Sequence, residues 1–468
     1  MRQVREAARL AMVLLVVWAA PARAARTLSL DEALALARAN NADLKAARAR
    51  LDEAQGDVEA SWSALLPKVS LQGRYTHNNK EVSLALGKML DGGVLGLAGV
   101  LAKTSSSAEE KAALGQFESQ LSAASSSPIV IQKEEQLDGN LNATVPLLAL
   151  PAYPALRAVK DSYAAQQASY SATEASVLLA VAETYFAAAG ADELLRARQD
   201  AVSLASQTLS TAKARVEAGA ATRVDEMRAE VALVRAKEAV TEALDTEARA
   251  YRALGTLMGT EEPVRVVPAA SEAAPLPPSE TLVRQALTLR PEIAANERLN
   301  EAAKLSAKAQ AWGWAPTLAA FGQAHVGNYE SFSGDDYAWA AGIELDWSIY
   351  DGGMRRAQED IDEARWAEGQ ARIEALRDSI RDGVVDARRA IGTKESALKA
   401  AGEEVDLAQA TLKLVRAQYD AGQATQLDLL QAQDSLVSAE VARASARFGL
   451  SLATIDLQRE TGTFPAGG

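Results

Sequence analysis

The clearest hydrophobic pattern in the chain is an alternation over residues 338–349. The two interleaved sets are Trp339, Ala341, Ile343, Leu345, Trp347 and Ile349 on one side and Ala338, Ala340, Gly342, Glu344, Asp346 and Ser348 on the other. A period of two residues is typical of a β-strand with one apolar face. The length of the run is near the roughly 9–11 residues that cross a membrane as a strand.

A second alternation runs from Leu137 to Leu147, and a third strand is predicted from Lys68 to His77. In the second run the apolar positions are Leu141, Ala143 and Val145, and the polar positions are Asn140, Asn142 and Thr144. Short strands of this kind indicate a sheet with one apolar and one polar face.

The stretches beside these strands have helical character. Residues 30–66 combine alanine and charged side chains at helical spacing, and Pro67 ends the run because it has no backbone N–H to donate. From about Ala155 to Ala218 there is no proline. We therefore predict a helix of some 60 residues, or roughly 95 Å at 1.5 Å per residue. Its apolar side chains form a narrow stripe, which favours coiled-coil packing over a deep core.

The two halves of the chain repeat one pattern. A shift of 203 residues places Gly219 on Gly422, Thr222 on Thr425, Asp225 on Asp428 and Gly259 on Gly462. A shift of 249 residues places Pro67 on Pro316 and Gly73 on Gly322. We therefore expect an α+β protein built from a duplicated unit with the order helix, strand, strand, long helix, turn, helix.

The two shifts differ because the first copy holds an insertion between its strands, at about residues 78–136. We place the first copy at residues 25–259 and the second at residues 281–468. Residues 260–280 contain five prolines and are predicted to be a linker with one short strand at Val264–Val267.

Each copy contains a short turn between two helices. The residues that define it are Gly219, Thr222 and Asp225 in the first copy and Gly422, Thr425 and Asp428 in the second. Glycine suits the left-handed residue after a helix end, and threonine suits the N-cap of the next helix. An acidic residue three positions after the cap completes a capping box and meets the helix dipole favourably. The pattern predicts a helical hairpin in each copy.

The repeated pattern A-x-x-x-x-G-x-x-T-x-x-D-x-x-x-A also has a specific likeness. It accompanies LSLDEALALA at residues 28–37, LLPKV at residues 65–69 and LDWSIYDGG at residues 345–353. Together these segments resemble the TolC-like outer membrane efflux protein family over nearly the whole chain after the leader.

The resemblance implies a homotrimer whose strands form one 12-stranded β-barrel in the outer membrane, at about four strands per protomer. A long α-helical barrel continues this channel into the periplasm. The implied function is a passive export duct of a tripartite efflux or type I secretion system. Its implied partners are a periplasmic adaptor (membrane fusion protein), an inner-membrane transporter and outer-membrane lipid. The predicted strands support the oligomeric barrel in part, because the few amphipathic strands of one chain would leave unpaired edges in lipid unless several copies cooperate.

The resemblance also assigns roles to single residues. Asp428 corresponds to a position that forms a carboxylate ring at the periplasmic aperture, and Asp225 and Tyr419 correspond to residues that hold the aperture shut. The chain departs from the family at Ala424, where an arginine reinforces closure, and at Gln431, where a second acidic ring lies. Alternatively, both aspartates only cap helices and Tyr419 is an ordinary packing residue.

The hairpin tips are implied to contact the adaptor. The tip residues concerned are Gly219, Thr222, Gly422 and Thr425. The insertion joins two strands on the side away from the helices, so we expect it outside the cell, either folded over the channel mouth or as a mobile loop.

Residues 1–24 are predicted to be a secretory signal peptide. Arg2, Arg5 and Arg9 precede an apolar run from Leu10 to Ala20, and Ala22-Arg23-Ala24 fits a cleavage site. The formal charge of the whole chain is −13, and the leader has four arginines and one glutamate, so the remainder carries −16. Such acidity argues against nucleic acid as a partner.

Composition adds little support for catalysis. There is no cysteine, and therefore no disulfide, thiolate metal site or lipidated cysteine. The two histidines, His77 and His325, do not align between the copies, and no phosphate-binding or nucleophile motif occurs. We predict no enzyme, cofactor or metal site. The alternative to a duct is a periplasmic coiled-coil adaptor or scaffold without a channel, and the sequence does not identify an exported substrate.

Overall fold

The computed structural model describes residues 26–84, 93–94, 96–124, 129–260, 262–267, 276–328 and 335–464. The chain is mostly helical. It forms two compact units, and each unit takes segments from both halves of the sequence. Unit 1 holds the described residues up to 55, 161–301 and 365 onward, and unit 2 holds 56–160 and 302–364. The predicted signal peptide lies outside the described residues.

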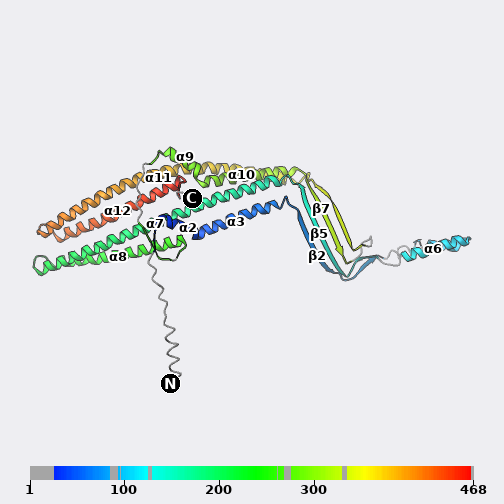
Figure 1. Cartoon of the computed structure of the whole chain (residues 1–468), viewed down its shortest axis with the longest axis horizontal. Helices are drawn as coiled ribbons and strands as arrows, with labels where there is room; N and C mark the ends of the chain where they lie inside the picture. Colours follow the sequence, from blue (N-terminus) through cyan, green and yellow to red (C-terminus); the bar gives the residue numbers. More distant parts are fainter. Residues whose placement is uncertain are drawn as a thin grey trace, which may run out of the picture. The chain divides into compact units, whose positions relative to one another are not determined.

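The main elements follow one another in the same order in both halves (Figure 1). The first half contains β1 (Arg26–Leu28), α2 (Leu30–Asn40), α3 (Ala42–Trp62), β2 (Lys68–His77), β5 (Glu135–Leu148), α7 (Ala152–Glu217), α8 (Arg223–Met258) and β6 (Val264–Val266). The second contains α9 (Ser279–Leu289), α10 (Pro291–Ala311), the 3-10 turn η2 (Trp312–Trp314), β7 (Thr317–Gly327), β8 (Tyr337–Asp346), α11 (Met354–Asp420) and α12 (Gln426–Glu460). The predicted strands and the long helix α7 are confirmed to within a few residues.

The predicted single helix over residues 30–66 is wrong, because α2 and α3 meet at Asn41 and α3 ends at Trp62. The Asn41 side chain is buried, and its Oδ1 accepts hydrogen bonds from the N–H groups of Asp43 (2.8 Å) and Leu44 (3.1 Å). Its Nδ2 donates to the carbonyl of Leu257 (2.8 Å) at the end of α8. A side chain that satisfies backbone groups in this way competes with continuation of the helix.

Unit 1 is held together by two apolar clusters. The first lies around the fully buried Tyr185 on α7 and includes apolar side chains of α2, α8 and α12. The Tyr185 hydroxyl lies 2.7 Å from the carbonyl oxygen of Val267 and 3.0 Å from that of Leu28. It thereby fixes the parallel pair of β1 and β6 to the long helix. The second cluster joins α9, α11 and α12 around Ile380 and Val384.

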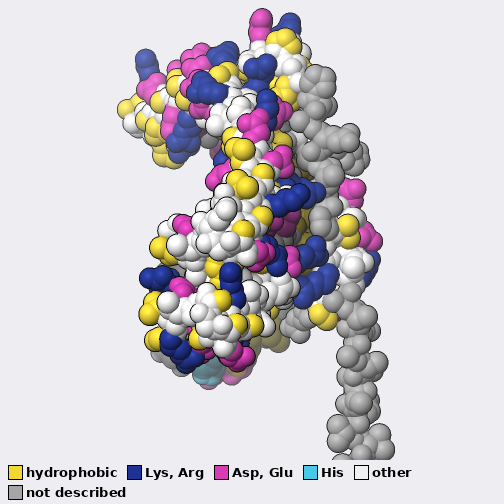
Figure 2. Space-filling view, turned by 90° about the vertical axis from the view of Figure 1, so that its left-hand side faces the viewer, with side chains coloured by type: hydrophobic (Ala, Val, Ile, Leu, Met, Phe, Trp, Pro, Cys, Tyr) yellow, Lys and Arg dark blue, Asp and Glu magenta, His cyan; other side chains and the backbone are white. Residues whose placement is uncertain are grey.

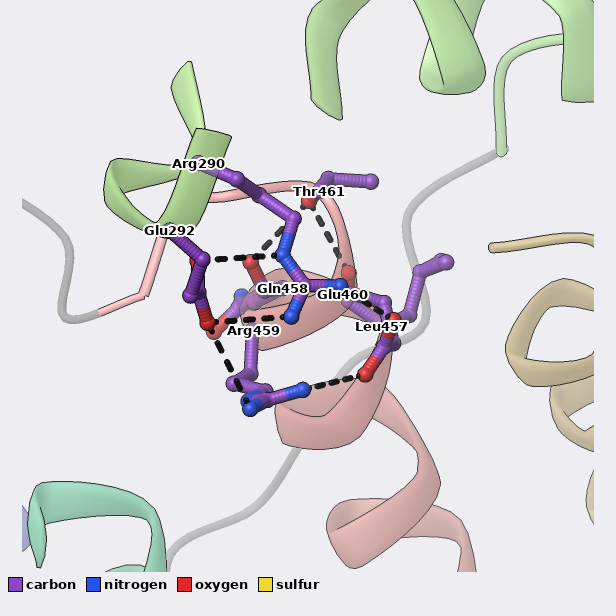
Figure 3. Close-up of polar contacts among 7 residues, drawn as sticks. All are labelled: Arg290, Glu292, Leu457, Gln458, Arg459, Glu460 and Thr461. Carbon is purple, nitrogen blue, oxygen red and sulfur yellow. Dashed lines mark hydrogen bonds and ion pairs between the residues drawn. The ribbon is translucent and has the colours of Figure 1, made fainter. Parts of the chain in front are cut away.

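A group of charged side chains joins the end of α12 to the break between α9 and α10 (Figure 3). Arg290 is 8% exposed and donates to Glu460 Oε2 (2.7 Å) and Glu292 Oε1 (3.0 Å). Arg459 contacts the same two carboxylates, Glu292 at 3.6 Å and Glu460 at 2.6 Å. Burial by itself would lower the pKa of Arg290 and raise that of Glu292. The hydrogen bonds and the attraction of the neighbouring opposite charges together outweigh burial, so the pKa of Arg290 is raised and that of Glu292 is lowered.

Unit 2 is built on an antiparallel sheet of four strands in the order β2-β5-β7-β8. The register aligns the alternating apolar positions of all four strands, as in the row Leu71, Leu141, Ala324 and Trp339. This apolar face is open to the surroundings of the chain, with Leu71 80% and Trp339 75% exposed. Among the described residues, β2 and β8 have no further strand beside them in this sheet.

The insertion between β2 and β5 has structure of its own in its described part. β3 (Val82–Leu84) pairs with β4 (Ile129–Gln132), and α5 (Gly96–Thr104) lies beside α6 (Ala108–Ala124). The sequence pattern did not predict these helices. The position of the insertion outside the cell stays a prediction. In the described part of the chain, no helix is both long and apolar enough to cross a membrane.

Candidate functional site

The first hairpin tip lies between α7 and α8 and follows the predicted capping geometry. Gly219 has a φ of 72°, the left-handed conformation in which a side chain would be strained. Thr222 is the N-cap of α8, and its Oγ1 accepts from the N–H of Asp225 at 3.3 Å. In return, Asp225 Oδ2 accepts from the N–H of Thr222 at 3.0 Å. The predicted capping box is confirmed.

The second tip repeats this geometry between α11 and α12. Gly422 has a φ of 70°, and Thr425 is the N-cap of α12. Thr425 Oγ1 accepts from the N–H of Asp428 at 3.2 Å, and Asp428 Oδ2 accepts from the N–H of Thr425 at 2.8 Å. Both tips therefore end in the same rigid turn. Gly219, Thr222, Gly422 and Thr425 are all exposed.

The carboxylates of the two boxes remain ionised at neutral pH. Hydrogen bonds from the side chain and then the backbone of Thr222 lower the pKa of Asp225, and the nearby Arg228 adds to this. Hydrogen bonds from Thr425 lower the pKa of Asp428 in the same way. The Asp428 side chain is exposed, so its negative charge is available to ions in solution.

Tyr419 on the second hairpin contacts Arg215 on the first, a residue that the sequence pattern did not indicate. The Arg215 guanidinium lies over the Tyr419 ring at 4.2 Å, and its Nη1 donates to the Tyr419 carbonyl at 2.9 Å. Tyr419 is buried, with 6% of its surface exposed. A further bond between the hairpins runs from Gln433 Nε2 to Thr208 Oγ1 at 2.8 Å. The structure thus brings Tyr419 to Arg215, while Asp225 and Asp428 are occupied by their own caps.

No pattern in the sequence pointed to Arg215. It is one of many charged residues of a long helix, and it aligns with Gln418, not with a basic residue, in the second copy. Its partner Tyr419 lies 204 residues further along the chain. Only the packing of one hairpin on the other reveals the pair.

The sequence profile of outer membrane efflux proteins matches residues 33–260 and 282–463. The chain belongs to the outer membrane efflux protein family. The resemblance inferred from the tip pattern is therefore confirmed, and with it the location in the outer membrane. This is a family of channel proteins rather than of enzymes.

Two relatives and one solved structure illustrate the match. The outer membrane efflux protein BepC of Brucella suis is 27% identical over 280 residues, 58% of this chain and 59% of BepC. Outer membrane protein OprJ of Pseudomonas aeruginosa is 26% identical over 316 residues, 65% of each chain. The chain thus spans less than two thirds of the length of either relative. The open state of the MtrE outer membrane channel of Neisseria gonorrhoeae shares the fold, with a TM-score of 0.70 at 21% identity over 92% of this chain and 88% of MtrE.

Gln431, which the resemblance placed at the aperture, lines a groove. The groove is about 740 Å³ and lies between α7, α8 and α12. Its apolar lining includes Val224, Met227 and Leu427, which are 54%, 55% and 45% exposed. Its polar lining is formed by Arg198, Arg228, Arg235, Gln431, Gln433 and Asp434.

The surface at the end that carries the hairpin tips has charges of both signs. Figure 2 shows basic and acidic side chains interspersed, with apolar side chains between them. Within the described ranges there is no group of three or more histidine, cysteine or acidic side chains arranged to hold a metal ion.

Proposed function

We propose that this chain is one protomer of a trimeric outer-membrane duct that exports the substrates of an inner-membrane transporter through a periplasmic adaptor. One observation carries the proposal: the same chain joins an amphipathic sheet with an open apolar face to two long helical hairpins. A protein in water would bury such a face, whereas lipid accommodates it. The hairpins then extend the duct away from the membrane.

The sheet needs further copies of the chain to be stable in lipid. Its edge strands β2 and β8 would leave backbone N–H and C=O groups without partners in the hydrocarbon. Pairing of β8 from one copy with β2 of the next satisfies both edges. Three copies of a four-stranded sheet supply twelve strands and close a barrel with a water-filled lumen.

The duplication gives each protomer two equivalent parts. Residues 25–259 contribute one strand pair and one hairpin, and residues 281–468 contribute another, joined by the linker at 260–280. We infer that the hairpins of all copies pack side by side as a helical barrel. Narrow apolar stripes on long helices suit such lateral packing.

The tips provide a surface for the adaptor. Near the first tip, Val224, Met227, Val231 and Val234 follow one another at spacings of three and four residues along α8, and each is at least 50% exposed. This is the heptad spacing of a coiled coil without its partner helix. We infer that a helical hairpin of the adaptor packs here and against the exposed turns at Gly219, Thr222, Gly422 and Thr425.

We further propose that Arg215 and Tyr419 hold the aperture closed. The family arginine expected at residue 424 is replaced by alanine, and Arg215 supplies a guanidinium to the second hairpin from the first. Separation of the hairpins would break the hydrogen bond and the ring contact together. Asp428 and Asp225 keep the tips rigid, and the exposed Asp428 carboxylates attract cations to the opening.

The aperture proposal can be tested with variants that separate its contacts. Arg215→Met removes both contacts, and we expect it to raise the open probability at least about fivefold, because a hydrogen bond to a charged donor contributes about 1.5–3 kcal/mol. Tyr419→Phe keeps the ring and the carbonyl, so its conductance should match the parent. Arg416→Met, an exposed arginine one turn earlier on α11, is the matched control. If all three variants conduct like the parent, the pair does not close the aperture.

The duct itself is tested with the purified protein. We expect an oligomer of three chains that dissociates only on heating, and stepwise conductance in planar lipid bilayers. An adaptor or scaffold without a channel would give neither result. The exposed apolar face of the sheet argues against that alternative, since a soluble scaffold would gain nothing from it.

A further inference from the structure

All four connections between the sheet and the long helices lie at one end of the sheet. β2 begins at Lys68 opposite Thr144 near the end of β5, and β7 begins at Thr317 opposite Asp346, the end of β8. Helices α3, α7, α10 and α11 therefore all join the sheet at this end. We call it the junction end.

Aromatic side chains gather at the junction end, and each is at least 39% exposed. They are Trp62, Tyr153, Trp312, Trp314, Trp347 and Tyr350. Trp347 continues the apolar alternation of β8, and its Nε1 donates to the carbonyl of Trp314 at 3.1 Å. The aromatic group is thus continuous with the apolar face of the sheet. Tryptophan and tyrosine gather in this way at the boundary between hydrocarbon and headgroups.

A lysine ammonium lies over each of two of these rings. Lys160 Nζ lies 4.9 Å from the centre of the Trp62 ring, and Lys308 Nζ lies 5.7 Å from that of Trp312. Both lysines are exposed, and neither has a carboxylate partner among the described residues. Arg355 differs, since it lies over Trp314 but is bound to Asp351 and to the carbonyls of Gly313 and Ser348. The two lysines are therefore positioned by an aromatic ring and free to take an anion.

We propose that the Lys160–Trp62 and Lys308–Trp312 pairs bind the headgroups of anionic phospholipids in the leaflet that faces the helices. The inference rests on the proposed position of the sheet in the bilayer. With the apolar face in hydrocarbon, the junction end lies at the depth of the phosphate groups. A lysine stem lies along the ring while its ammonium reaches the phosphate, and the ring contacts the glycerol and upper acyl chain. The two pairs come from separate segments, so they hold the chain at two points.

The test measures quenching of the tryptophan fluorescence of the full protein in mixed vesicles of phosphatidylcholine and phosphatidylglycerol. The acyl chains of one of the two lipids are brominated, and these chains quench nearby rings. We expect phosphatidylglycerol to bind the parent more tightly than phosphatidylcholine, by up to about fivefold for each lysine, and so to quench it more strongly. The double variant Lys160→Gln, Lys308→Gln should lose this preference. The double variant Lys103→Gln, Lys111→Gln removes the same charge from α5 and α6 and should keep it.

Three results would overturn the inference: no preference in the parent, the same preference in the Lys160, Lys308 variant, or equal loss in both double variants. Equal quenching by both lipids would favour a protein or cell-wall partner for these lysines. Failure of the proposed function looks different, because a sheet outside the bilayer would be quenched by neither lipid. Retained stepwise conductance in both double variants shows that the fold is intact.

Discussion

A single carboxylate at residue 428 serves a structural purpose and leaves its charge exposed. Asp428 accepts the N–H of Thr425 and completes the first turn of α12, yet its side chain remains open to solvent. Capping a helix and attracting cations are compatible, because the hydrogen bonds stabilise the ionised form. The two roles can nevertheless be separated by substitution.

Asp428→Asn should weaken block of the channel by polyvalent cations, since the proposed carboxylate ring loses its charge. Thr425→Ala should leave the block unchanged and lower the stability of the tip by about 1 kcal/mol, because the N-cap is lost while the charge stays. Single-channel recordings with a trivalent cation and thermal unfolding measure the two effects. Unchanged block in Asp428→Asn would restrict Asp428 to capping.

Acid should loosen both tips. Asp225 and Asp428 have a pKa below the ordinary value of 3.8 in the folded protein. Their contribution to stability is therefore complete above pH 3.8 and is lost as the pH falls through the lower folded values. Amide hydrogen exchange at the tips should show this loss in the parent and a flatter dependence in the double variant Asp225→Asn, Asp428→Asn. A parent profile equal to that of the variant would contradict the linkage.

Among the helices, α11 and α10 pack closely at Gly369. A Cβ at this position would lie closer than 3.0 Å to the Asn300 side chain, whose Oδ1 is buried and has no hydrogen-bond partner among the described residues. Glycine inside a helix normally costs about 1 kcal/mol relative to alanine. At Gly369 the missing side chain allows α10 and α11 to lie close together.

Gly369→Ala should therefore destabilise the protein by about 1–3 kcal/mol, the usual cost of overpacking. Gly392→Ala on the same helix meets nothing within 4 Å and should stabilise it. Urea unfolding of both variants gives the comparison. Adding Asn300→Ala to Gly369→Ala should restore most of the loss, and a failure of this rescue would mean that the strain lies elsewhere.

The charged group around Arg290 holds the end of α12 against the start of α10 (Figure 3). In the first half of the chain, Asn41 joins the start of α3 to the end of α8 in a corresponding way. Arg290→Met should cost about 2–4 kcal/mol, because Glu292 and Glu460 would stay partly buried with only the more exposed Arg459 beside them. Arg389→Met breaks an exposed pair with Asp386 and should cost less than about 1 kcal/mol. Equal unfolding midpoints for the two variants would show that the group contributes little.

At the scale of the molecule, the two faces of the sheet should tolerate charge very differently. Leu71→Arg places a cation on the apolar face and should cost about 2–4 kcal/mol near the bilayer centre. Gln72→Arg, the next residue of β2, places it on the polar face and should be accepted. The amount of heat-resistant oligomer in the outer-membrane fraction measures both. Equal yields would mean that the apolar face does not contact lipid.

The sequence by itself determined the features that depend on neighbouring residues. The capping boxes at Thr222 and Thr425 require side chains only three positions apart, and the faces of the strands require only alternation. These local patterns were sufficient to predict both hairpins, the strands of the four-stranded sheet and the family.

Tertiary structure decided the contacts between residues far apart in the chain. Arg215 meets Tyr419 across 204 residues, and Asn41 reaches Leu257 across 216, so neither pair leaves a spacing that a sequence pattern can show. The paired helices of the insertion were also not predicted, since their apolar and small residues lack a clear helical period. The sequence thus specified how each hairpin turns, and only packing decided which side chains tie one hairpin to the other.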